Sequence, residues 1–356
     1  NNDFFCRTLW RSDVGFAESY IAGDWDCGDL AGLLRSFADN SQYLGASNFA
    51  AAIFGKAISR IHHLARSNSL AGSRRNIAKH YDLSNAFFQT FLDDNMTYSC
   101  ALFSRQDETL ESAQRNKLKS IICKAGIEEH HHVLEIGCGW GSFAIEAAKA
   151  TGCRVTALTL SKAQYEEAEK RVRDAGLRDR VKVLLMDYRQ MSGQYDRIIS
   201  IEMLEAVGHA HFGDFFASID HLLLPGGIAV LQVITIPDQR YEAYRKGIDF
   251  IQAHIFPGGH LPALTPLCNA MTRHSQFTVE SLSNHNQDYA RTLKIWRQRF
   301  IQNRERVSAL GFDIYFQRKW EYYLAYCEAG FSSRMLNLLQ IVLTRPGCSG
   351  SVAPTR

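Results

Sequence analysis

The chain has 356 residues, 46% of them hydrophobic, which is enough for a large core and about two domains. A net charge of +3 does not by itself indicate a nucleic-acid partner, and no apolar run approaches the ~18 residues that span a bilayer. The nine cysteines show neither a C-x-x-C pair nor the His/Cys spacing of a metal site, so we expect reduced thiols in a cytosolic protein without a metal centre. The sequence begins at Asn1 rather than Met, which leaves a removed targeting segment open.

The first 75 residues differ in pattern from the rest of the chain. Up to about residue 40, apolar side chains recur at helical spacing and predict helices with turns between them: Phe4, Phe5, Leu9, Trp10, Leu30, Leu33, Leu34 and Phe37. Residues 41–75 are polar and basic and end in Gly72-Ser73-Arg74-Arg75, which indicates a linker or a loose pair of helices. We therefore divide the chain into residues 1–75 and 76–356.

From about residue 112, strand and helix patterns alternate. The predicted strands are Val133–Ile136, Val155–Leu160, Val181–Met186, Ile198–Ile201 and Ile228–Ile236. The predicted helices between them are Ser142–Ala150, Ser161–Ala175 and Phe212–Leu224. This alternation is typical of an α/β fold with a mostly parallel, doubly wound sheet.

Residues 237–316 interrupt the alternation. They are aromatic and partly helical, with a marked turn at Phe256-Pro257-Gly258-Gly259. A helix near Lys319–Ala329 and a strand at Leu338–Thr344 then complete the pattern. An insertion so late in the sheet is well placed to form a lid over the strand ends.

A glycine-spaced turn follows the first predicted strand. The strand ends in Glu135-Ile136, and Gly137-Cys138-Gly139-Trp140-Gly141 leads into a helix. Glycine lets the backbone approach a ligand closely, and the free N–H groups of a helix start favour a carboxylate or phosphate. The pattern therefore predicts a nucleotide-like cofactor, which both dehydrogenases and S-adenosylmethionine methyltransferases bind at this place.

Two local features favour the methyltransferase. An NAD site needs G-x-G-x-x-G and an acidic ribose partner about 20 residues on. Here the third glycine comes one residue early, and the second strand ends in Leu158-Thr159-Leu160-Ser161 without a carboxylate. Glu135 before the first glycine is typical of the methyltransferase loop, and Asp187 follows the third strand where an adenine-contacting residue usually lies.

The chain resembles the cyclopropane-fatty-acid synthases and the related mycolic acid methyltransferases, most closely the plant-type and similar bacterial members. The matching motifs run through nearly the whole chain: His80-Tyr81-Asp82-Leu83-Ser84-Asn85, Met96-Thr97-Tyr98-Ser99-Cys100-Ala101, Ala113-Gln114, Lys117-Leu118, Leu158-Thr159-Leu160-Ser161, Glu205-Ala206-Val207-Gly208-His209, Ile255-Phe256-Pro257-Gly258-Gly259 and Trp320-Glu321-Tyr322-Tyr323-Leu324. The resemblance implies a class I S-adenosylmethionine methyltransferase fold, and it makes residues 1–75 similar to the accessory domain of the longer bacterial synthases.

The resemblance also implies a cofactor site for S-adenosylmethionine. Its expected residues, together with the acidic and glycine positions above, are Tyr98, Ser99, Glu135, Gly137, Gly139, Gly141, Thr159, Leu160, Gln164, Asp187, Tyr188 and Ile201. In members of the family, the tyrosine and serine close over the cofactor, and the first glycines approach its methionine part.

For catalysis, the resemblance implies attack by a cis double bond on the sulfonium methyl group, followed by proton removal from the new methyl. The family uses a bound bicarbonate ion as the base. Its site is built from backbone at Cys100, from Glu205 and Tyr323, and from a histidine after the fifth strand. In this chain that histidine is Gln232, which hydrogen-bonds but does not titrate. Glu202 also stands where the bacterial pattern has glycine.

Several of these residues have a structural reading beside the functional one. Cys100 is a candidate base, but a packing role is favoured. Glu205 can complement a helix dipole, and Tyr323 can be a core tyrosine. The run Glu128-Glu129-His130-His131-His132 resembles a metal site, but we expect an exposed loop. The residues Arg291, Lys294, Arg297 and Arg299 make either a helix for anionic lipid or a solvated helix face.

We predict a cytoplasmic enzyme, peripherally associated with the membrane, that forms cyclopropane rings on unsaturated phospholipid acyl chains. A fatty-acid C-methyltransferase is the alternative, because loss of a different proton from the cation gives a methylene chain that a reductase turns into a methyl branch. A lipid-binding module without catalysis is a further alternative. Acyl length, head group and subunit number, including a homodimer, stay open.

Overall fold

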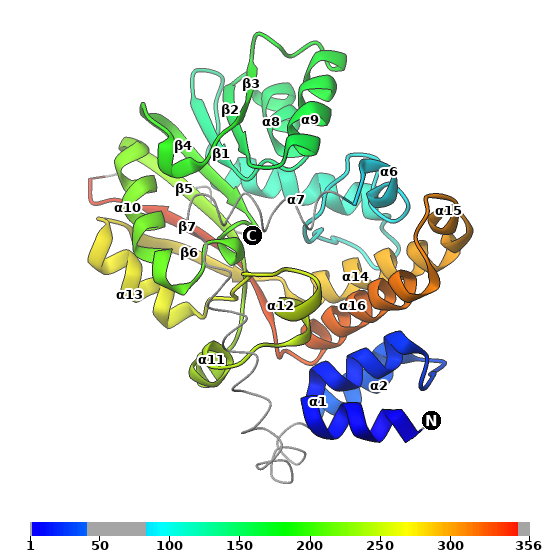
Figure 1. The fold of residues 1–356 in the computed structure, drawn as a ribbon. Helices are drawn as coiled ribbons and strands as arrows, with labels where there is room; N and C mark the ends of the chain where they lie inside the picture. Colours follow the sequence, from blue (N-terminus) through cyan, green and yellow to red (C-terminus); the bar gives the residue numbers. More distant parts are fainter. Residues whose placement is uncertain (1, 41–82, 348–356) are drawn as a thin grey trace.

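The computed structural model describes residues 2–40 and 83–347, so the predicted linker at 41–75 and the His80-Tyr81-Asp82 motif lie outside it. A seven-stranded sheet with the order β3-β2-β1-β4-β5-β7-β6 forms the centre (Figure 1). Its strands are β1 His132–Ile136, β2 Arg154–Thr159, β3 Val181–Leu185, β4 Tyr195–Ile201, β5 Leu223–Thr235, β6 Thr278–Asn284 and β7 Asn337–Thr344. β1 to β5 pair in parallel, whereas β7 runs antiparallel to both of its neighbours.

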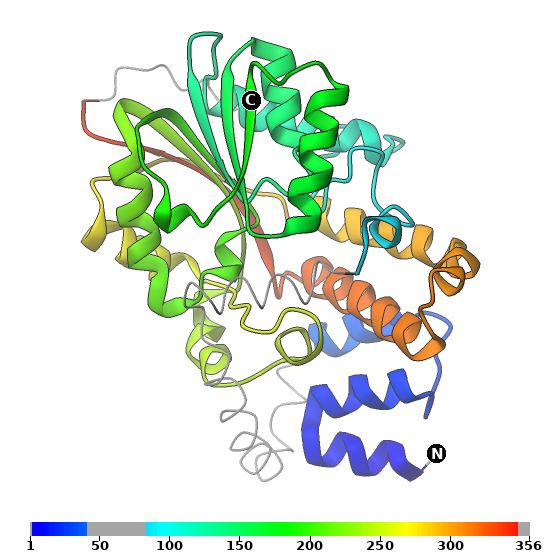
Figure 2. The same cartoon turned by 45° about the horizontal axis from the view of Figure 1, so that its top comes forward.

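Helices cover both faces of the sheet, as Figures 1 and 2 show. One face packs against α7 Leu110–Lys124, α8 Ser142–Thr151 and α9 Lys162–Asp174, and the other against α10 Phe212–Leu222 and α13 Leu264–His274. Because side chains alternate along a strand, Val133 joins the first core and Leu134 the second. This arrangement confirms the predicted class I methyltransferase architecture.

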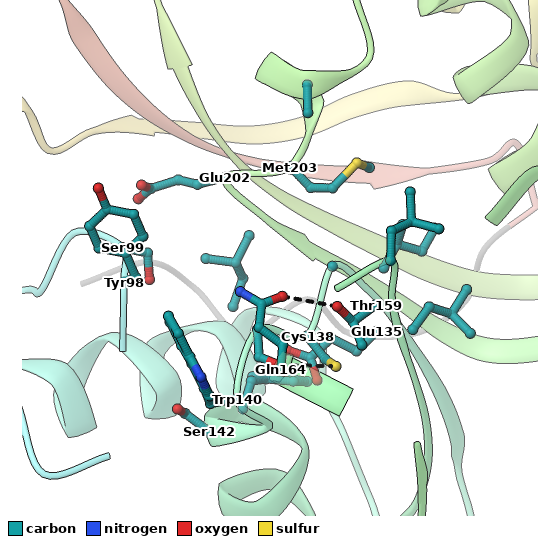
Figure 3. A pocket seen from close by; sticks show the side chains of 18 of the residues that line it. Tyr98, Ser99, Glu135, Cys138, Trp140, Ser142, Thr159, Gln164, Glu202 and Met203 are labelled. Atoms are coloured by element: carbon teal, nitrogen blue, oxygen red, sulfur yellow. Dashed lines mark hydrogen bonds between the residues drawn. The ribbon is translucent and has the colours of Figure 1, made fainter. Parts of the chain in front are cut away.

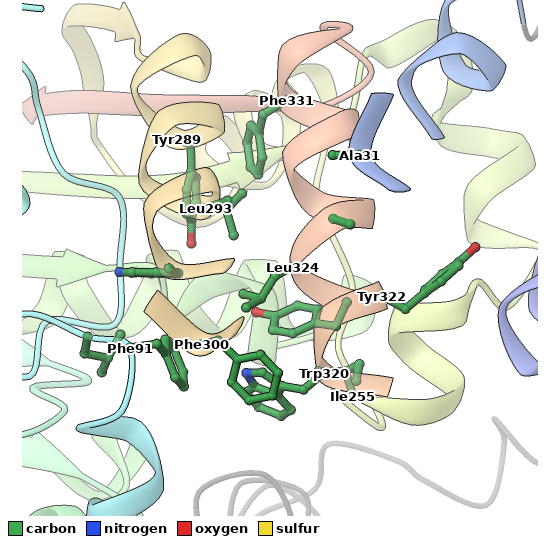
Figure 4. Packing of buried hydrophobic residues seen from close by; sticks show 14 of the residues in the cluster. Ala31, Phe91, Ile255, Tyr289, Leu293, Phe300, Trp320, Tyr322, Leu324 and Phe331 are labelled. Carbon is green, nitrogen blue, oxygen red and sulfur yellow. The ribbon is translucent and has the colours of Figure 1, made fainter. Parts of the chain in front are cut away.

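The first two helices pack on the C-terminal half of the chain. α1 Asn2–Ala22 and α2 Leu30–Asp39 lie against α16 Ile314–Ser332. The ring of Tyr20 lies 5.7 Å from that of Tyr322, and the Arg318 guanidinium lies 4.1 Å over Tyr20. These contacts belong to one aromatic-rich core with α14 Asn286–Gln302 (Figure 4). The helices predicted before residue 40 are therefore present, and the boundary at residue 75 stays a prediction.

The range 237–316, predicted as a lid, contributes both a strand to the sheet and a helix to one of its faces. Its role as a lid stays a prediction. Its middle part contains α13, which packs on α10, and the edge strand β6, which the sequence pattern does not predict. β6 has the sequence Thr-Val-Glu-Ser-Leu-Ser-Asn, and its residues are mostly exposed, so it lacks the hydrophobic alternation of a half-buried strand. The range also contains α14 and the helices α11 Asp238–Arg245, α12 Phe250–His254 and α15 Arg304–Ala309.

Short elements connect the sheet to its helices. They are α6 Asn85–Phe88 and three 3-10 turns, η1 Tyr188–Gln190, η2 Leu204–Ala206 and η3 His209–His211. η1 and η2 begin just beyond the carboxyl ends of β3 and β4, which places them on the same edge of the sheet as the glycine turn after β1. In open α/β sheets this edge is where ligands bind.

Candidate active site

The turn after β1 has the backbone conformation that glycine permits. Gly137, Gly139 and Gly141 have φ angles of 87°, 53° and 82°, all in the left-handed region. A Cβ on Gly137 would lie 2.8 Å from Met203 Cγ, so a larger residue does not fit there. Gly141 caps α8 and faces Ala168 of α9, which gives it a packing role.

This turn forms one wall of a pocket (Figure 3). Every predicted cofactor residue except Gly141 lines it: Tyr98, Ser99, Glu135, Gly137, Gly139, Thr159, Leu160, Gln164, Asp187, Tyr188 and Ile201. The loop that carries Ser99 is held by α7, because Gln114 donates to the Ser99 carbonyl and Lys117 to the Ser99 hydroxyl, each at 2.8 Å. The sequence thus brings residues from distant segments to one cavity, and their role in cofactor binding stays a prediction.

Glu135 is a buried carboxylate on the pocket wall. It is 2% exposed, and its Oε2 has no hydrogen-bond partner in the part of the chain that the structure describes. Burial raises its pKa to about 8, while the nearby Lys117 ammonium acts in the opposite direction. A buried acceptor without a donor is costly, so this carboxylate suits a ligand that carries a positive, hydrogen-bonding group.

Side-chain hydrogen bonds also arrange other residues of the pocket wall. The Thr159 hydroxyl donates to Gln164 Oε1 at 2.9 Å. Asp187, expected as an adenine contact, accepts two bonds from the Arg189 guanidinium at 2.9 and 2.7 Å. Tyr188 packs edge-on against Phe215, with ring centroids 5.5 Å apart. These contacts give the pocket a rigid, partly aromatic wall.

Glu202, which was not among the predicted site residues, is the polar centre of the site. Its Oε1 accepts from the Cys100 N–H at 2.9 Å and from Gln232 Nε2 at 2.7 Å, and its Oε2 accepts from the Tyr289 hydroxyl. The side chain lines the pocket and points towards Tyr98 and Ser99 (Figure 3). Burial raises its pKa, and the three donors together with Lys117 limit the increase.

The backbone at Glu202 accounts for the glycine of the bacterial pattern. Its φ is 51°, a left-handed conformation that costs a non-glycine residue roughly 1–2 kcal/mol. The sequence did contain a signal for this residue, namely a carboxylate in place of glycine directly after a buried strand. A strained residue whose side chain is held by three donors is a candidate for function.

The four predicted catalytic residues lie around this carboxylate or next to it. Cys100 and Gln232 donate to Glu202, as described above. Tyr323 shares a hydrogen bond of 2.8 Å between its hydroxyl and that of Tyr98, a pocket residue. Glu205 accepts from the Ile234 N–H, and its buried Oε2 has no partner among residues 2–40 and 83–347. Burial and the charge of Glu202 raise its pKa to about 8.

The chemistry of Cys100 agrees with packing. Its sulfur is fully buried, and burial followed by the charge of Glu202 raises the pKa of the thiol well above its ordinary value. The thiol therefore stays protonated and donates to the Ala101 carbonyl at 3.0 Å. The backbone N–H of Cys100, not its side chain, reaches the site.

Comparison with known proteins identifies the family. A family model described as mycolic acid cyclopropane synthetase matches residues 68–341. The chain is 40% identical to the tuberculostearic acid methyltransferase of Mycobacterium tuberculosis, over 97% of this chain and 82% of that protein. It is 35% identical to the cyclopropane-fatty-acyl-phospholipid synthase of Escherichia coli, over 97% and 86%.

A solved structure leads to the same result. A mycolic acid cyclopropane synthase complexed with SAH and CTAB is 32% identical and has a TM-score of 0.71, covering 76% of this chain and 97% of that one. The chain belongs to the mycolic acid cyclopropane synthetase family. It is an S-adenosylmethionine-dependent methyltransferase, as the motifs predicted.

The residues of this family member fit S-adenosylmethionine. Glu135 Oε2, which has no partner among the described residues, would suit the α-ammonium group of the methionine part, and the open space at Gly139 leaves room for close backbone approach. Thr159, Gln164 and Tyr188 line the same pocket. The family resemblance implies that Thr159 and Gln164 hold the ribose side and that Tyr188 lies near the adenine, and these roles stay predictions. When bound, the cofactor supplies an electrophilic methyl group on sulfur.

Two surface motifs have structural explanations. In the first motif, potential ligand atoms of Glu128, His130 and His131 lie within 4.8 Å of one another. Glu128 and His130 are exposed, whereas His131 is buried and its Nδ1 accepts a hydrogen bond from the Glu128 N–H. The absence of a metal stays a prediction.

On α14, Arg297 and Arg299 pair with Glu328 and Glu111 at 2.9 and 2.7 Å.

A third basic side chain on α14 is also engaged. Arg291 donates to three backbone carbonyls, those of Arg105, Gln106 and Glu108, and stacks 3.8 Å over Phe103. These contacts favour the structural reading of the α14 cations over a lipid-binding face. In the part of the chain that the structure describes, no helix is long and apolar enough to cross a membrane.

Proposed function

We propose that this methyltransferase adds one carbon to the cis double bond of an unsaturated phospholipid acyl chain and closes a cyclopropane ring. The observation that carries the proposal is a partly buried carboxylate, Glu202, on the wall of the cofactor pocket. An alkene has no proton to remove before it attacks, but the resulting cation must lose one afterwards. A proton acceptor that lies beside the pocket, next to a thiol that stays protonated, suits this order of events.

Aromatic side chains around the pocket suit a cationic intermediate on the acyl chain. The ring of Tyr98 lies 5.3 Å from those of Phe88 and Trp296, and Trp140 lies 5.1 Å from Phe88. The faces of such rings attract positive charge when water is excluded. Their packing also excludes water, which would capture a carbocation and give an alcohol.

Glu202 is the proposed base, in the place that the family resemblance gives to bicarbonate. Two groups expected to hold that ion, the Cys100 N–H and the Gln232 side chain, donate to the Glu202 carboxylate. The carboxylate accepts a proton from the newly added methyl group, and the electrons of that C–H bond close the ring. Glu205 and Tyr323 orient the surroundings through Ile234 and Tyr98.

A bicarbonate ion in addition to Glu202 is the competing proposal. Glu205 still has an unpartnered oxygen, so a donor such as the hydroxyl of a protonated ion suits it. Measuring turnover in buffers depleted of carbon dioxide separates the two: Glu202 as base requires no response to the ion.

The second candidate function is a fatty-acid C-methyltransferase that leaves a methylene group, ready for reduction to a methyl branch. The favouring observation is the 40% identity to a relative named for tuberculostearic acid. Both products need the same proton acceptor. A hydride shift moves the cation to the carbon that bears the new methyl, and loss of a proton from that methyl then gives the methylene instead of the ring. The products therefore differ in this shift and not, as expected from the sequence, in which group loses the proton. The base alone therefore does not select the product.

The decisive experiment supplies the purified chain with methyl-labelled S-adenosylmethionine and vesicles of a phospholipid that has one cis-unsaturated chain. NMR of the extracted lipid distinguishes ring protons from an exocyclic methylene, which share one mass. A saturated phospholipid is the matched control. Label in neither lipid would refute acyl-chain transfer, and co-sedimentation with the vesicles tests the proposed visit to the membrane surface.

A further inference from the structure

A row of buried polar side chains leads from Glu202 across three strands of the sheet. Gln232 on β5 is the register partner of Gln340 on β7, and Gln340 is the partner of Ser283 on β6. Both glutamines are 1% exposed. In a sheet core of Val, Ile and Leu, two adjacent buried amides require a specific reason, because each polar atom needs a partner.

The hydrogen bonds along this row have one direction. Lys124, at the end of α7, donates to Gln340 Oε1 and to the Ser283 hydroxyl. Gln340 Nε2 donates to Gln232 Oε1 at 2.8 Å, and Gln232 Nε2 donates to Glu202 at 2.7 Å. Each amide turns its oxygen towards the lysine and its nitrogen towards the carboxylate.

The two ends of the row force this direction. An ammonium group has only donors, and an ionised carboxylate has only acceptors. With Lys124 at one end, Gln340 must present its oxygen there and its NH₂ to the next amide, and the same holds for Gln232. We propose that Lys124 is a positioning residue that, through Gln340, keeps the NH₂ of Gln232 turned towards the Glu202 carboxylate and so keeps that base ionised.

The row orients and does not conduct protons. A proton would have to pass through two amides, which neither gain nor lose one in this pH range. The effect is electrostatic: the Gln232 donor offsets the burial that raises the Glu202 pKa. Without Lys124, either amide can turn over, and a carbonyl oxygen facing the carboxylate raises that pKa further.

Other charged groups around Glu202 set the background for this effect. Lys117 of α7 lowers its pKa, and Tyr289 of α14 donates to it. Glu205 of η2 lies beside it, and burial together with the Glu202 charge raises the pKa of Glu205 itself to about 8. At the other end, Lys124 lies next to Cys123, and Ser283 passes the row on to His285 Nε2 at 2.9 Å. None of these groups fixes the direction of the two amides.

The inference rests on Glu202 as the base in the proposed function, but its test has a readout that needs no turnover. In protein labelled with carboxyl-¹³C glutamate, with the Glu202 signal assigned through Glu202→Gln, NMR titration reports the carboxyl pKa directly. We expect Lys124→Met to raise that pKa by about one unit and Lys124→Arg, a donor-only replacement, to restore it.

The activity profile is the second readout. The acidic limb of kcat against pH should move up by the same unit in Lys124→Met, so that turnover on that limb falls about tenfold, with S-adenosylmethionine affinity unchanged. Lys119→Met, an exposed lysine of the same helix, is the control and should match the wild type. Gln340→Met breaks the row at a second point if Lys124→Met does not fold.

The outcomes separate the two ideas. If Lys124→Met folds and Glu202 titrates as in the wild type, the positioning role of Lys124 is refuted. This conclusion does not depend on which product the enzyme forms. If the Glu202 pKa shifts in Lys124→Met but the pH profile of kcat does not, the positioning role of Lys124 is supported. In that case Glu202 does not act in the rate-determining step.

Discussion

Replacing Glu202 by glycine should turn an ion-independent enzyme into one that needs bicarbonate. In Glu202→Gly the Cys100 N–H, the Gln232 amide and the Tyr289 hydroxyl lose their common acceptor, and the space of one carboxylate opens beside the pocket. A bicarbonate ion is a planar carboxylate of similar size. The left-handed backbone at this position, with φ 51°, suits glycine without strain.

The magnitude follows from the contacts. Removing a positioned general base lowers turnover by about 10²–10⁴-fold. Each hydrogen bond to a charged acceptor contributes roughly 1.5–3 kcal/mol, so three vacated donors bind a bicarbonate ion well enough to occupy the site at millimolar concentration. We therefore expect turnover of Glu202→Gly to recover by at least about tenfold when bicarbonate is added.

The assay measures label transfer from S-adenosylmethionine to unsaturated phospholipid in sealed, carbon dioxide-free buffer, with bicarbonate then added back. Glu202→Gln is the matched control, because its amide fills the same space and accepts one hydrogen bond but neither takes a proton nor admits the ion. It should stay inactive with bicarbonate. A wild type that requires the ion, together with a Glu202→Gly that ignores it, would refute the reasoning.

Three further predictions concern the residues nearby. Glu135→Gln should weaken S-adenosylmethionine binding by about 10–100-fold in calorimetry, because the amide that replaces the buried carboxylate has no negative charge to attract an ammonium group. Cys100→Ala should keep turnover within about twofold, since only the backbone N–H of this residue reaches Glu202. Glu205→Gln should lower turnover more than cofactor affinity. The same substitution should also remove a pH dependence of stability. The Glu205 pKa is about 8 in the folded chain, against an ordinary value of 4.5, so between these pH values the native state binds more protons than the unfolded chain. The wild type therefore loses stability as the pH rises from 4.5 to 8, and Glu205→Gln should not. Urea unfolding at pH 5 and pH 9 checks this.

The pocket at the glycine turn was predictable because its signals are local. The turn at Gly137 and Gly139 follows a strand and precedes a helix within ten residues, and the left-handed backbone at both positions makes glycine a physical requirement. The ends of β2 and β3 then reach the same edge, since parallel strands align their carboxyl ends. From these rules, Thr159 and Asp187 are placed beside the turn without any structure.

The carboxylate site was not predictable in the same way, because its contacts join distant parts of the chain. Glu202 meets donors at Cys100, Gln232 and Tyr289, and the last of these lies on a helix that follows the edge strand β6. β6 itself is mostly exposed and polar, so its sequence pattern does not predict that Ser283 on this strand ends a row of buried polar side chains. Only the register of β5, β7 and β6 shows that Gln232 and Gln340 are neighbours.

The chain retains an arrangement at Glu202 that is costly on two counts. A non-glycine residue with a left-handed backbone costs roughly 1–2 kcal/mol, and burial of the carboxylate adds a penalty that is visible in its raised pKa. A packed fold would gain stability from glycine at this position, as in the bacterial pattern, if structure were the whole reason. Three donors from three separate segments, one of them directed through two amides by Lys124, hold the side chain in place against both costs. Backbone strain that several contacts hold in place is expected where a group acts on a substrate. The arrangement therefore supports Glu202 as the base over a bicarbonate ion bound from solution.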